Sequence, residues 1–178
     1  LFDDLLERIT DATIQYFEMQ IEAGVDALQI FDSWGGALAA DAFRQASLPW
    51  IEKIVDAIDG RVPVIVFAKN MSHLSGDLAD TGAEVVGVDW TAEIDEVYGR
   101  LPEGVGIQGN LDPTILDLEP DIVETQTRTI LEAMAGKPGH IFNLGHGIER
   151  TTDPDQVKFL VDRVHEATRG KRQESRGK

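Results

Sequence analysis

The sequence predicts an α/β fold with a parallel sheet, and three observations lead to this prediction. Five short runs rich in β-branched residues are typical of strands, at residues 25–31, 62–68, 84–89, 104–108 and 140–144. Most of these runs are almost continuously apolar, which is typical of strands buried on both faces. Polar residues and then an apolar pattern of helical period follow the strands. This alternation favours a parallel sheet with helices outside it.

The helical segments of the first third of the chain carry clear start and stop signals. Residues 10–23 place Ile14, Phe17 and Ile21 at helical spacing, and Gly24 stands where a glycine commonly ends a helix. Residues 39–58 carry a second helical pattern. Pro49 is expected to break or kink that second helix, because proline cannot donate a backbone hydrogen bond.

Four further helices are expected, at residues 74–81, 92–98, 119–135 and 153–168. The first two are short. The last opens with Asp153 and Pro154, a favourable pair for the N-cap and the first helical position.

Two architectures fit this order of elements: an open doubly wound sheet and part of a (β/α)8 barrel. Gly104-Val105-Gly106 lies inside a predicted strand and does not open a helix, so the dinucleotide-binding fingerprint is lacking. A closed barrel has eight βα units in about 250 residues. About five units in 178 residues therefore predict a piece of a barrel that begins partway through a longer chain. We expect one domain over residues 1–168 and a basic, disordered tail over 169–178.

The composition narrows the classes of function. No apolar run approaches the roughly 20 residues that span a bilayer, which argues against a membrane protein. The 32 acidic residues outnumber the 16 basic ones, giving a net charge of -16 that would repel nucleic acid. The absence of cysteine excludes disulfides, thiolate nucleophiles and zinc sites built on sulfur. We expect a cytoplasmic protein, whose acidity fits either a high-salt cytoplasm or an ordinary acidic protein.

Polar and glycine-rich residues follow every predicted strand. The clusters are residues 32–36, 69–70, 89–91, 109–113 and 143–147. Ligands bind at the carboxyl ends of the strands in parallel α/β folds. The sequence therefore predicts a concave polar site at that edge of the sheet.

His146 and Ser33 are the foremost candidates within these clusters. His146 lies between two glycines, where it can donate hydrogen bonds to a carboxylate or transfer a proton; the alternative is a turn residue bonded to a neighbouring carbonyl. Ser33 lacks the Gly-x-Ser-x-Gly setting of a nucleophile, so we expect its hydroxyl to hydrogen-bond a ligand.

The remaining candidates have a structural alternative. Asp32 and Asp89 can act as paired carboxylates or accept hydrogen bonds from backbone amides. Lys69 can form a Schiff base or meet an anionic substrate. Asn110 stands in a segment that is either pocket lining or a turn and helix start. The other histidines, His73, His140 and His165, are not spaced as ligands on one helix face, so we expect no metal site.

Taken together, the motifs resemble the uroporphyrinogen decarboxylase family. The resemblance rests on Phe-Asp-Ser-Trp-Gly-Gly at 31–36, Val-Asp-Trp at 88–90, Gln-Gly-Asn-Leu-Asp-Pro at 108–113 and Phe-Asn-Leu-Gly-His-Gly-Ile at 142–148. The helix at 157–168 is similar to the last helix of that family. The similarity extends to about residue 168.

The resemblance implies the C-terminal part of a (β/α)8 TIM barrel and an enzyme of heme biosynthesis. Such an enzyme removes carbon dioxide from the four acetate side chains of uroporphyrinogen III and yields coproporphyrinogen III. The resemblance further implies that the enzyme uses no metal or organic cofactor and that it forms a homodimer, as is common in the family. By motif, Ser33 and His146 would bind substrate. Further candidates for the pocket lining are Asp32, Lys69, Asp89, Asn110 and Asn143.

Several family features are missing from this sequence. It has no arginine- and glycine-rich motif of the kind that grips the substrate's acid groups, and no match to the family's essential Asp on an early strand or to its Tyr on the next. Tyr16 and Tyr98 lie on predicted helices. We expect these elements upstream of Leu1, so this chain contains no catalytic residue and is inactive alone.

Two alternatives to the decarboxylase remain. One is a related methyltransferase for corrinoid or thiol substrates, although such relatives bind zinc through His and Cys and this chain has no Cys. The other is a partial barrel that serves as a non-catalytic binding protein.

Overall fold

Five parallel strands form a single sheet. The computed structural model describes residues 1–175, and their side chains as far as residue 169. The strands are β1 (Leu28–Asp32), β2 (Val64–Ala68), β3 (Val85–Gly87), β4 (Gly106–Leu111) and β5 (His140–Leu144). They pair in sequence order, with β1 and β5 at the two edges, and every pair is parallel. The parallel sheet and its five strands are confirmed.

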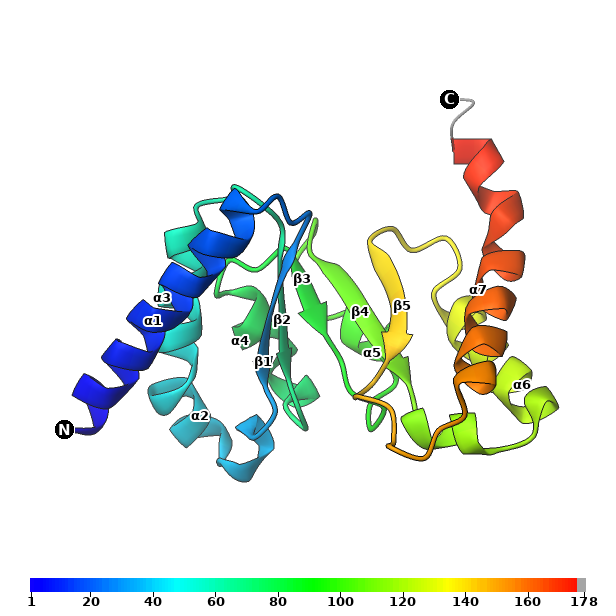
Figure 1. The fold of residues 1–178 in the computed structure, drawn as a ribbon, viewed down its shortest axis with the longest axis horizontal. Helices are drawn as coiled ribbons and strands as arrows, with labels where there is room; N and C mark the ends of the chain where they lie inside the picture. The colour runs from blue at the N-terminus through cyan, green and yellow to red at the C-terminus, as the bar shows by residue number, and fades with distance from the viewer. Residues whose placement is uncertain (176–178) are drawn as a thin grey trace.

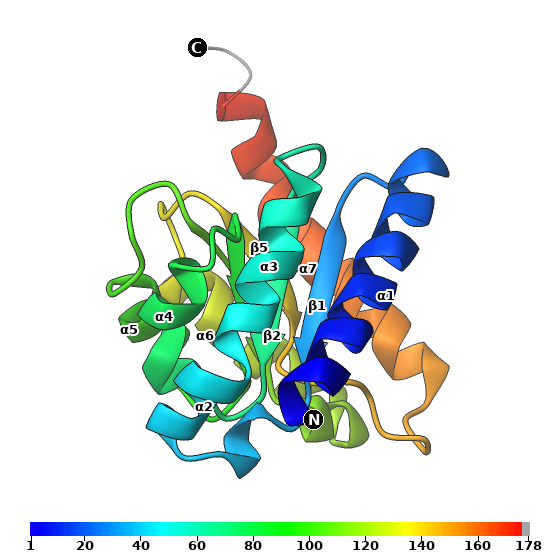
Figure 2. The ribbon, with the colours of Figure 1, turned by 90° about the vertical axis from the view of Figure 1, so that its left-hand side faces the viewer.

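Seven α-helices accompany the sheet in the described residues. They are α1 (Phe2–Glu22), α2 (Ala40–Ala46), α3 (Leu48–Ile58), α4 (Ser75–Ala79), α5 (Ile94–Tyr98), α6 (Pro120–Ala133) and α7 (Pro154–Ser175). Helices α1 and α3 flank the β1 end of the sheet, and α6 and α7 flank the β5 end (Figure 1). Turning the molecule shows α3 in front of β2, with α1 beside it (Figure 2).

In the part of the chain that the structure describes, the helices pack against one face of the sheet. Leu28, Ile30, Val64 and Val66 belong to the apolar cluster that also contains residues of α1 and α3. At the other end, Phe142 of β5 packs in a cluster with residues of β4, α6 and α7. The alternate side chains of the same strands face away from the helices. This arrangement is a barrel wall, because a doubly wound sheet has helices on both faces.

The sheet is strongly curved about its uncovered face. Gln108 of β4 donates a hydrogen bond from Nε2 to Oε1 of Gln29 on β1, at 3.3 Å. In a flat sheet these strands, three places apart, would be separated by roughly 14 Å. Two side chains that stand upright on a flat sheet would not meet over that span. The curvature confirms part of a (β/α)8 barrel.

Two helices differ from the prediction in ways that tertiary contacts explain. Helix α1 begins at Phe2, eight residues before the predicted start. Its first half is held to α3 by Lys53, whose Nζ lies 3.4 Å from Glu7 and 3.2 Å from Asp11. The predicted helix 39–58 is broken at Ser47, and Pro49 stands in the first turn of α3, as expected of a residue that ends one helix and opens another.

Strand β4 and helix α7 extend further than predicted. Gly109, Asn110 and Leu111 pair in register with residues of β5, so backbone pairing overrides the turn preference of their sequence. Helix α7 continues to Ser175, so residues 169–175 of the expected disordered tail are helical. This stretch contains Lys, Arg, Gln and Glu, which favour helix. The last three residues of that tail, 176–178, lie outside the described residues. No helix in the described part has the length and apolar character that crossing a membrane requires.

Candidate functional site

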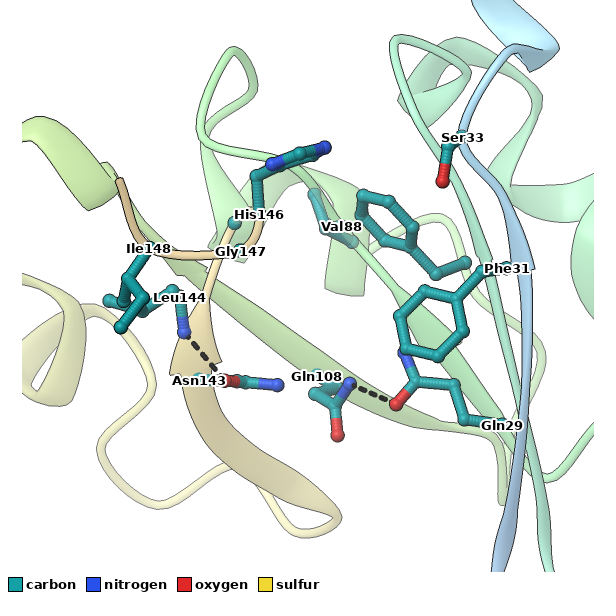
Figure 3. A pocket seen from close by; sticks show the side chains of 12 residues that line it. Gln29, Phe31, Ser33, Val88, Gln108, Asn143, Leu144, His146, Gly147 and Ile148 are labelled. Atoms are coloured by element: carbon teal, nitrogen blue, oxygen red, sulfur yellow. Dashed lines mark hydrogen bonds between the residues drawn. The ribbon is translucent and has the colours of Figure 1, made fainter. Parts of the chain in front are cut away.

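A pocket of about 470 Å³ lies on the uncovered face, at the carboxyl edge of the sheet. Figure 3 shows side chains from β1, β4, β5 and the loop after β5 turned toward it. Its lining consists of Gln29, Phe31, Ser33, Phe67, Val88, Gln108, Asn143, Leu144, Gly145, His146, Gly147 and Ile148. Residues of β1, β2, β4 and β5, and of the loops after β1 and β5, therefore line one concavity.

Three of the predicted site residues line this pocket: Ser33, Asn143 and His146. Ser33 follows β1 and His146 follows β5, so they approach the pocket from opposite ends of the sheet (Figure 3). Asn143 Oδ1 accepts a hydrogen bond from the backbone N–H of Leu144 at 2.8 Å, which leaves its amide NH₂ group toward the pocket. Hydroxyl, amide and imidazole groups here are all able to donate hydrogen bonds to carboxylates.

The loop that carries His146 is held against β4 and the loop after β3. Gly145 donates its N–H to the Leu111 carbonyl at 2.7 Å. A Cβ atom at Gly145 would overlap the backbone of Trp90 and approach the Asp89 carbonyl carbon to 3.0 Å. The ring of His146 meets that of Trp90 edge to face, with centroids 6.0 Å apart. Glycine at 145 therefore permits the contact that fixes the position of His146.

Asp89 lies outside the pocket lining and acts as a buried anchor. It is fully buried, and its carboxylate accepts hydrogen bonds from the N–H of Asn70 at 2.6 Å, the N–H of Thr91 at 2.9 Å and the Thr91 hydroxyl. These donors come from the loops after β2 and β3. The carboxylate thus joins two neighbouring loops, in agreement with the structural alternative for this residue.

Asp32 has a similar local role beneath the loop after β1. It accepts hydrogen bonds from the Ser47 hydroxyl at 2.5 Å and the Trp34 N–H at 3.3 Å. It does not line the pocket. Asp32 and Asp89 are therefore occupied by separate sets of donors and do not form a carboxylate pair.

Asn110 also differs from the expected pocket role. Its side chain is buried and donates to the carbonyls of Asp89 at 3.0 Å and Ala92 at 2.7 Å. These two bonds fix the loop after β3. Lys69 is half-buried and is not part of the pocket lining; its Nζ lies 5.5 Å from the centroid of the Trp90 ring.

Several lining residues were absent from the sequence-based list. Phe31, Phe67, Val88 and Ile148 give the pocket apolar walls, while Gln29 and Gln108 form a hydrogen-bonded pair across it. The two glutamines do carry a signal in the sequence, because each is a polar residue inside an otherwise apolar strand. A polar residue in such a strand often faces a site.

The other described histidines lie outside this pocket. Burial lowers the pKa of His140 below its usual value, against an opposing effect of its contact with the Gly109 carbonyl, 3.0 Å from Nε2. His73 lines a separate depression beside α5. Within the residues that the structure describes, no group of three His, Cys, Asp or Glu side chains is arranged to hold a metal ion.

Comparison with known proteins gives a consistent result. The family model "Uroporphyrinogen decarboxylase (URO-D)" matches residues 1–167. The uroporphyrinogen decarboxylase of Streptomyces avermitilis is 46% identical over 169 residues, covering 94% of this chain and 48% of that protein. The one from Ralstonia pickettii is 45% identical over 185 residues, covering 97% of this chain and 50% of that protein. The chain spans about half the length of the curated relatives it matches.

Among solved structures, a methyltransferase from Methanosarcina mazei is similar to this chain with a TM-score of 0.77 and 24% identity. The match covers 88% of this chain and 47% of that one. A monomeric dihydrodipicolinate synthase variant gives a TM-score of 0.57 with 17% identity. At these identities the likeness concerns the fold alone.

Proposed function

The chain belongs to the uroporphyrinogen decarboxylase family, and from this membership we propose that it supplies one side of the substrate site of that enzyme. The reaction is the removal of carbon dioxide from the four acetate side chains of uroporphyrinogen III, without a cofactor, to give coproporphyrinogen III. The observation that carries the proposal is the pocket in which Ser33, Asn143 and His146 converge.

The pocket combines the two kinds of contact that such a substrate needs. Its apolar walls, including Phe31 and Phe67, suit the faces of pyrrole rings, while Ser33, Asn143 and His146 offer hydrogen-bond donors at the rim. We assign Ser33 and His146 to substrate carboxylates. Asn143 serves as a further donor, and Gln29 with Gln108 forms the polar floor between β1 and β4.

The chemistry requires a proton donor in addition to these binding groups. Protonation of a pyrrole ring carbon lets the ring accept the electron pair of the breaking bond between the acetate methylene and its carboxylate. Carbon dioxide leaves, the methylene carbon takes a proton that solvent supplies and becomes a methyl group, and the ring proton returns to the donor. Asp32 and Asp89 are committed to backbone and hydroxyl donors. We therefore propose that this chain binds and orients substrate, while a carboxylate outside it holds the pyrrole N–H groups.

The setting of the enzyme belongs to the same proposal. We propose a cytoplasmic homodimer that uses a small-molecule substrate and binds neither nucleic acid nor membrane. The excess of acidic residues, 32 against 16 basic ones, supports the absence of a nucleic-acid partner. The methyltransferase alternative gains no support from its structural likeness, which shows only a shared fold.

The test is a decarboxylation assay of the complete gene product that contains this chain. We expect conversion of the eight-carboxylate porphyrinogen to the four-carboxylate product, and no conversion would overturn the proposal. His146→Ala should lower kcat/KM while the circular dichroism spectrum is retained. His73→Ala, an exposed histidine outside the pocket, is the matched control. Unchanged kinetics for His146→Ala would refute the role of His146 in substrate binding but not the proposed function as a whole.

A further inference from the structure

Lys69 is fixed by its backbone at the carboxyl end of β2, two residues after Phe67 of the pocket lining. It directly follows β2, donates its N–H to the Asp32 carbonyl at 3.0 Å and accepts from the Gly36 N–H at 2.9 Å. The next residue, Asn70, donates its N–H to the buried Asp89 carboxylate. The start of the Lys69 side chain is therefore held in place before any ligand binds, which lowers the entropy cost of binding.

The aromatic ring of Trp90 links Lys69 to the pocket. Lys69 Nζ lies 5.5 Å from the centroid of that ring, and the same ring lies 6.0 Å from the ring of His146. His146 lines the pocket, whereas Lys69 is not part of the lining. Trp90 thus has the Lys69 ammonium group and the His146 imidazole around one aromatic ring, so the two groups can bind separate anionic arms of one ligand.

The charge of Lys69 is not neutralised by the protein. Most lysines and arginines whose side chains are described pair with a carboxylate, as Arg44 does with Asp77 and Lys53 does with Asp11. Within the described residues, no carboxylate lies within 4.0 Å of Lys69 Nζ, although acidic residues outnumber basic ones two to one. A cation placed on an aromatic ring keeps its charge available to an incoming anion.

We propose that Lys69 binds a peripheral carboxylate of the substrate, in a subsite separate from that of Ser33 and His146. This inference rests on the proposed function, since that function supplies a ligand with several carboxylate arms around one macrocycle. The pocket holds the ring system, and Lys69 binds an arm that projects past Trp90. Lys69 is accordingly a binding residue and takes no part in proton transfer.

The test uses the complete gene product and three variants. Lys69→Met removes the charge while keeping an unbranched apolar stem, and Lys69→Arg keeps the charge. Lys137→Met is the matched control, because Lys137 also lies over an aromatic ring, that of Tyr98 at 5.9 Å, but precedes β5, at the edge of the sheet opposite the pocket. Thermal melts by circular dichroism establish that each variant is folded.

We expect Lys69→Met to raise KM for the eight-carboxylate porphyrinogen about five- to tenfold with little change in kcat, as the loss of one charge-assisted contact predicts. Lys69→Arg and Lys137→Met should stay near the wild-type KM. Added salt should raise the KM of the wild type more than that of Lys69→Met. A wild-type KM in Lys69→Met, or a fall in kcat with KM unchanged, would overturn the subsite. Inactivity of the wild type would instead overturn the proposed function.

Discussion

Replacing Asp89 by Asn should destabilise the fold more than a single buried substitution usually does. The carboxylate is fully buried and receives two N–H groups and one hydroxyl, from Asn70 and Thr91. Asparagine has a single acceptor oxygen, so turning that oxygen toward Thr91 places its NH₂ group against the N–H of Asn70. A buried donor left without an acceptor costs about 1–3 kcal/mol, and the charge on the remaining bonds is also lost. We expect a loss of about 2–4 kcal/mol in the free energy of unfolding.

The chain contains a matched control for this substitution. Asp112 makes the same local pattern, because its Oδ1 accepts the N–H of Thr114 at 2.9 Å and the Thr114 hydroxyl at 2.8 Å. This pattern is solvent-exposed, and one oxygen receives both bonds. Asp112→Asn can therefore keep both bonds and should cost less than about 1 kcal/mol.

Urea titrations of the complete gene product, followed by circular dichroism, measure both variants on the same scale. A loss for Asp89→Asn equal to that for Asp112→Asn would refute the reasoning, since burial and the number of donors would then have no effect. A loss below about 0.5 kcal/mol for Asp89→Asn would refute it as well, because that is the size of an ordinary surface substitution.

Three other predictions follow from single features of the structure. Gly145→Ala should lower kcat/KM and stability because its Cβ would meet the backbone of the loop after β3. Gly76→Ala, in α4 outside the pocket and with open space around it, should leave both near wild type in the same assays. Burial lowers the pKa of His140 in the folded state, so the unfolded chain takes up this proton first as the pH falls below about 6.5. The free energy of unfolding should therefore decline below this pH, and less steeply in His140→Gln than in the wild type. Urea titrations that give the same decline for both proteins would contradict this. The 178-residue chain alone should self-associate or be molten, because β1 and β5 are open edges and Phe31 is 65% exposed; a monomer with a sharp melt in light scattering and calorimetry would refute this.

The strands and the edge that carries the pocket could be predicted from the sequence because their signals are local. An apolar run of β-branched residues predicts a buried strand whatever its partners are, and β5 begins and ends at the predicted residues. Parallel strands place their carboxyl ends at one edge, so the clusters with Ser33 and His146 had to lie at the same edge of the sheet, although only its curvature brings them to one pocket. The family could be identified for the same reason, since its motifs are continuous in the chain.

The choice between binding groups and structural groups depended on the direction of each side chain, which only the tertiary structure decides. Asp89, Asn110 and Asn143 all stand near strand ends, and nothing local separates them. The side chains of Asp89 and Asn110 form hydrogen bonds with neighbouring loops and are not available to a ligand. Asn143, in contrast, lies on the uncovered face.

The length of β4 and the pairing of Gln29 with Gln108 were decided at long range too. The backbone of β4 continues through a sequence typical of a turn because β5 offers it hydrogen-bonding partners. The glutamines meet because the sheet curves, and curvature arises from all the strands together. The sequence by itself determined the elements, their order and the family. The tertiary structure determined which polar groups remain available to a ligand, because that depends on contacts between residues far apart in the chain.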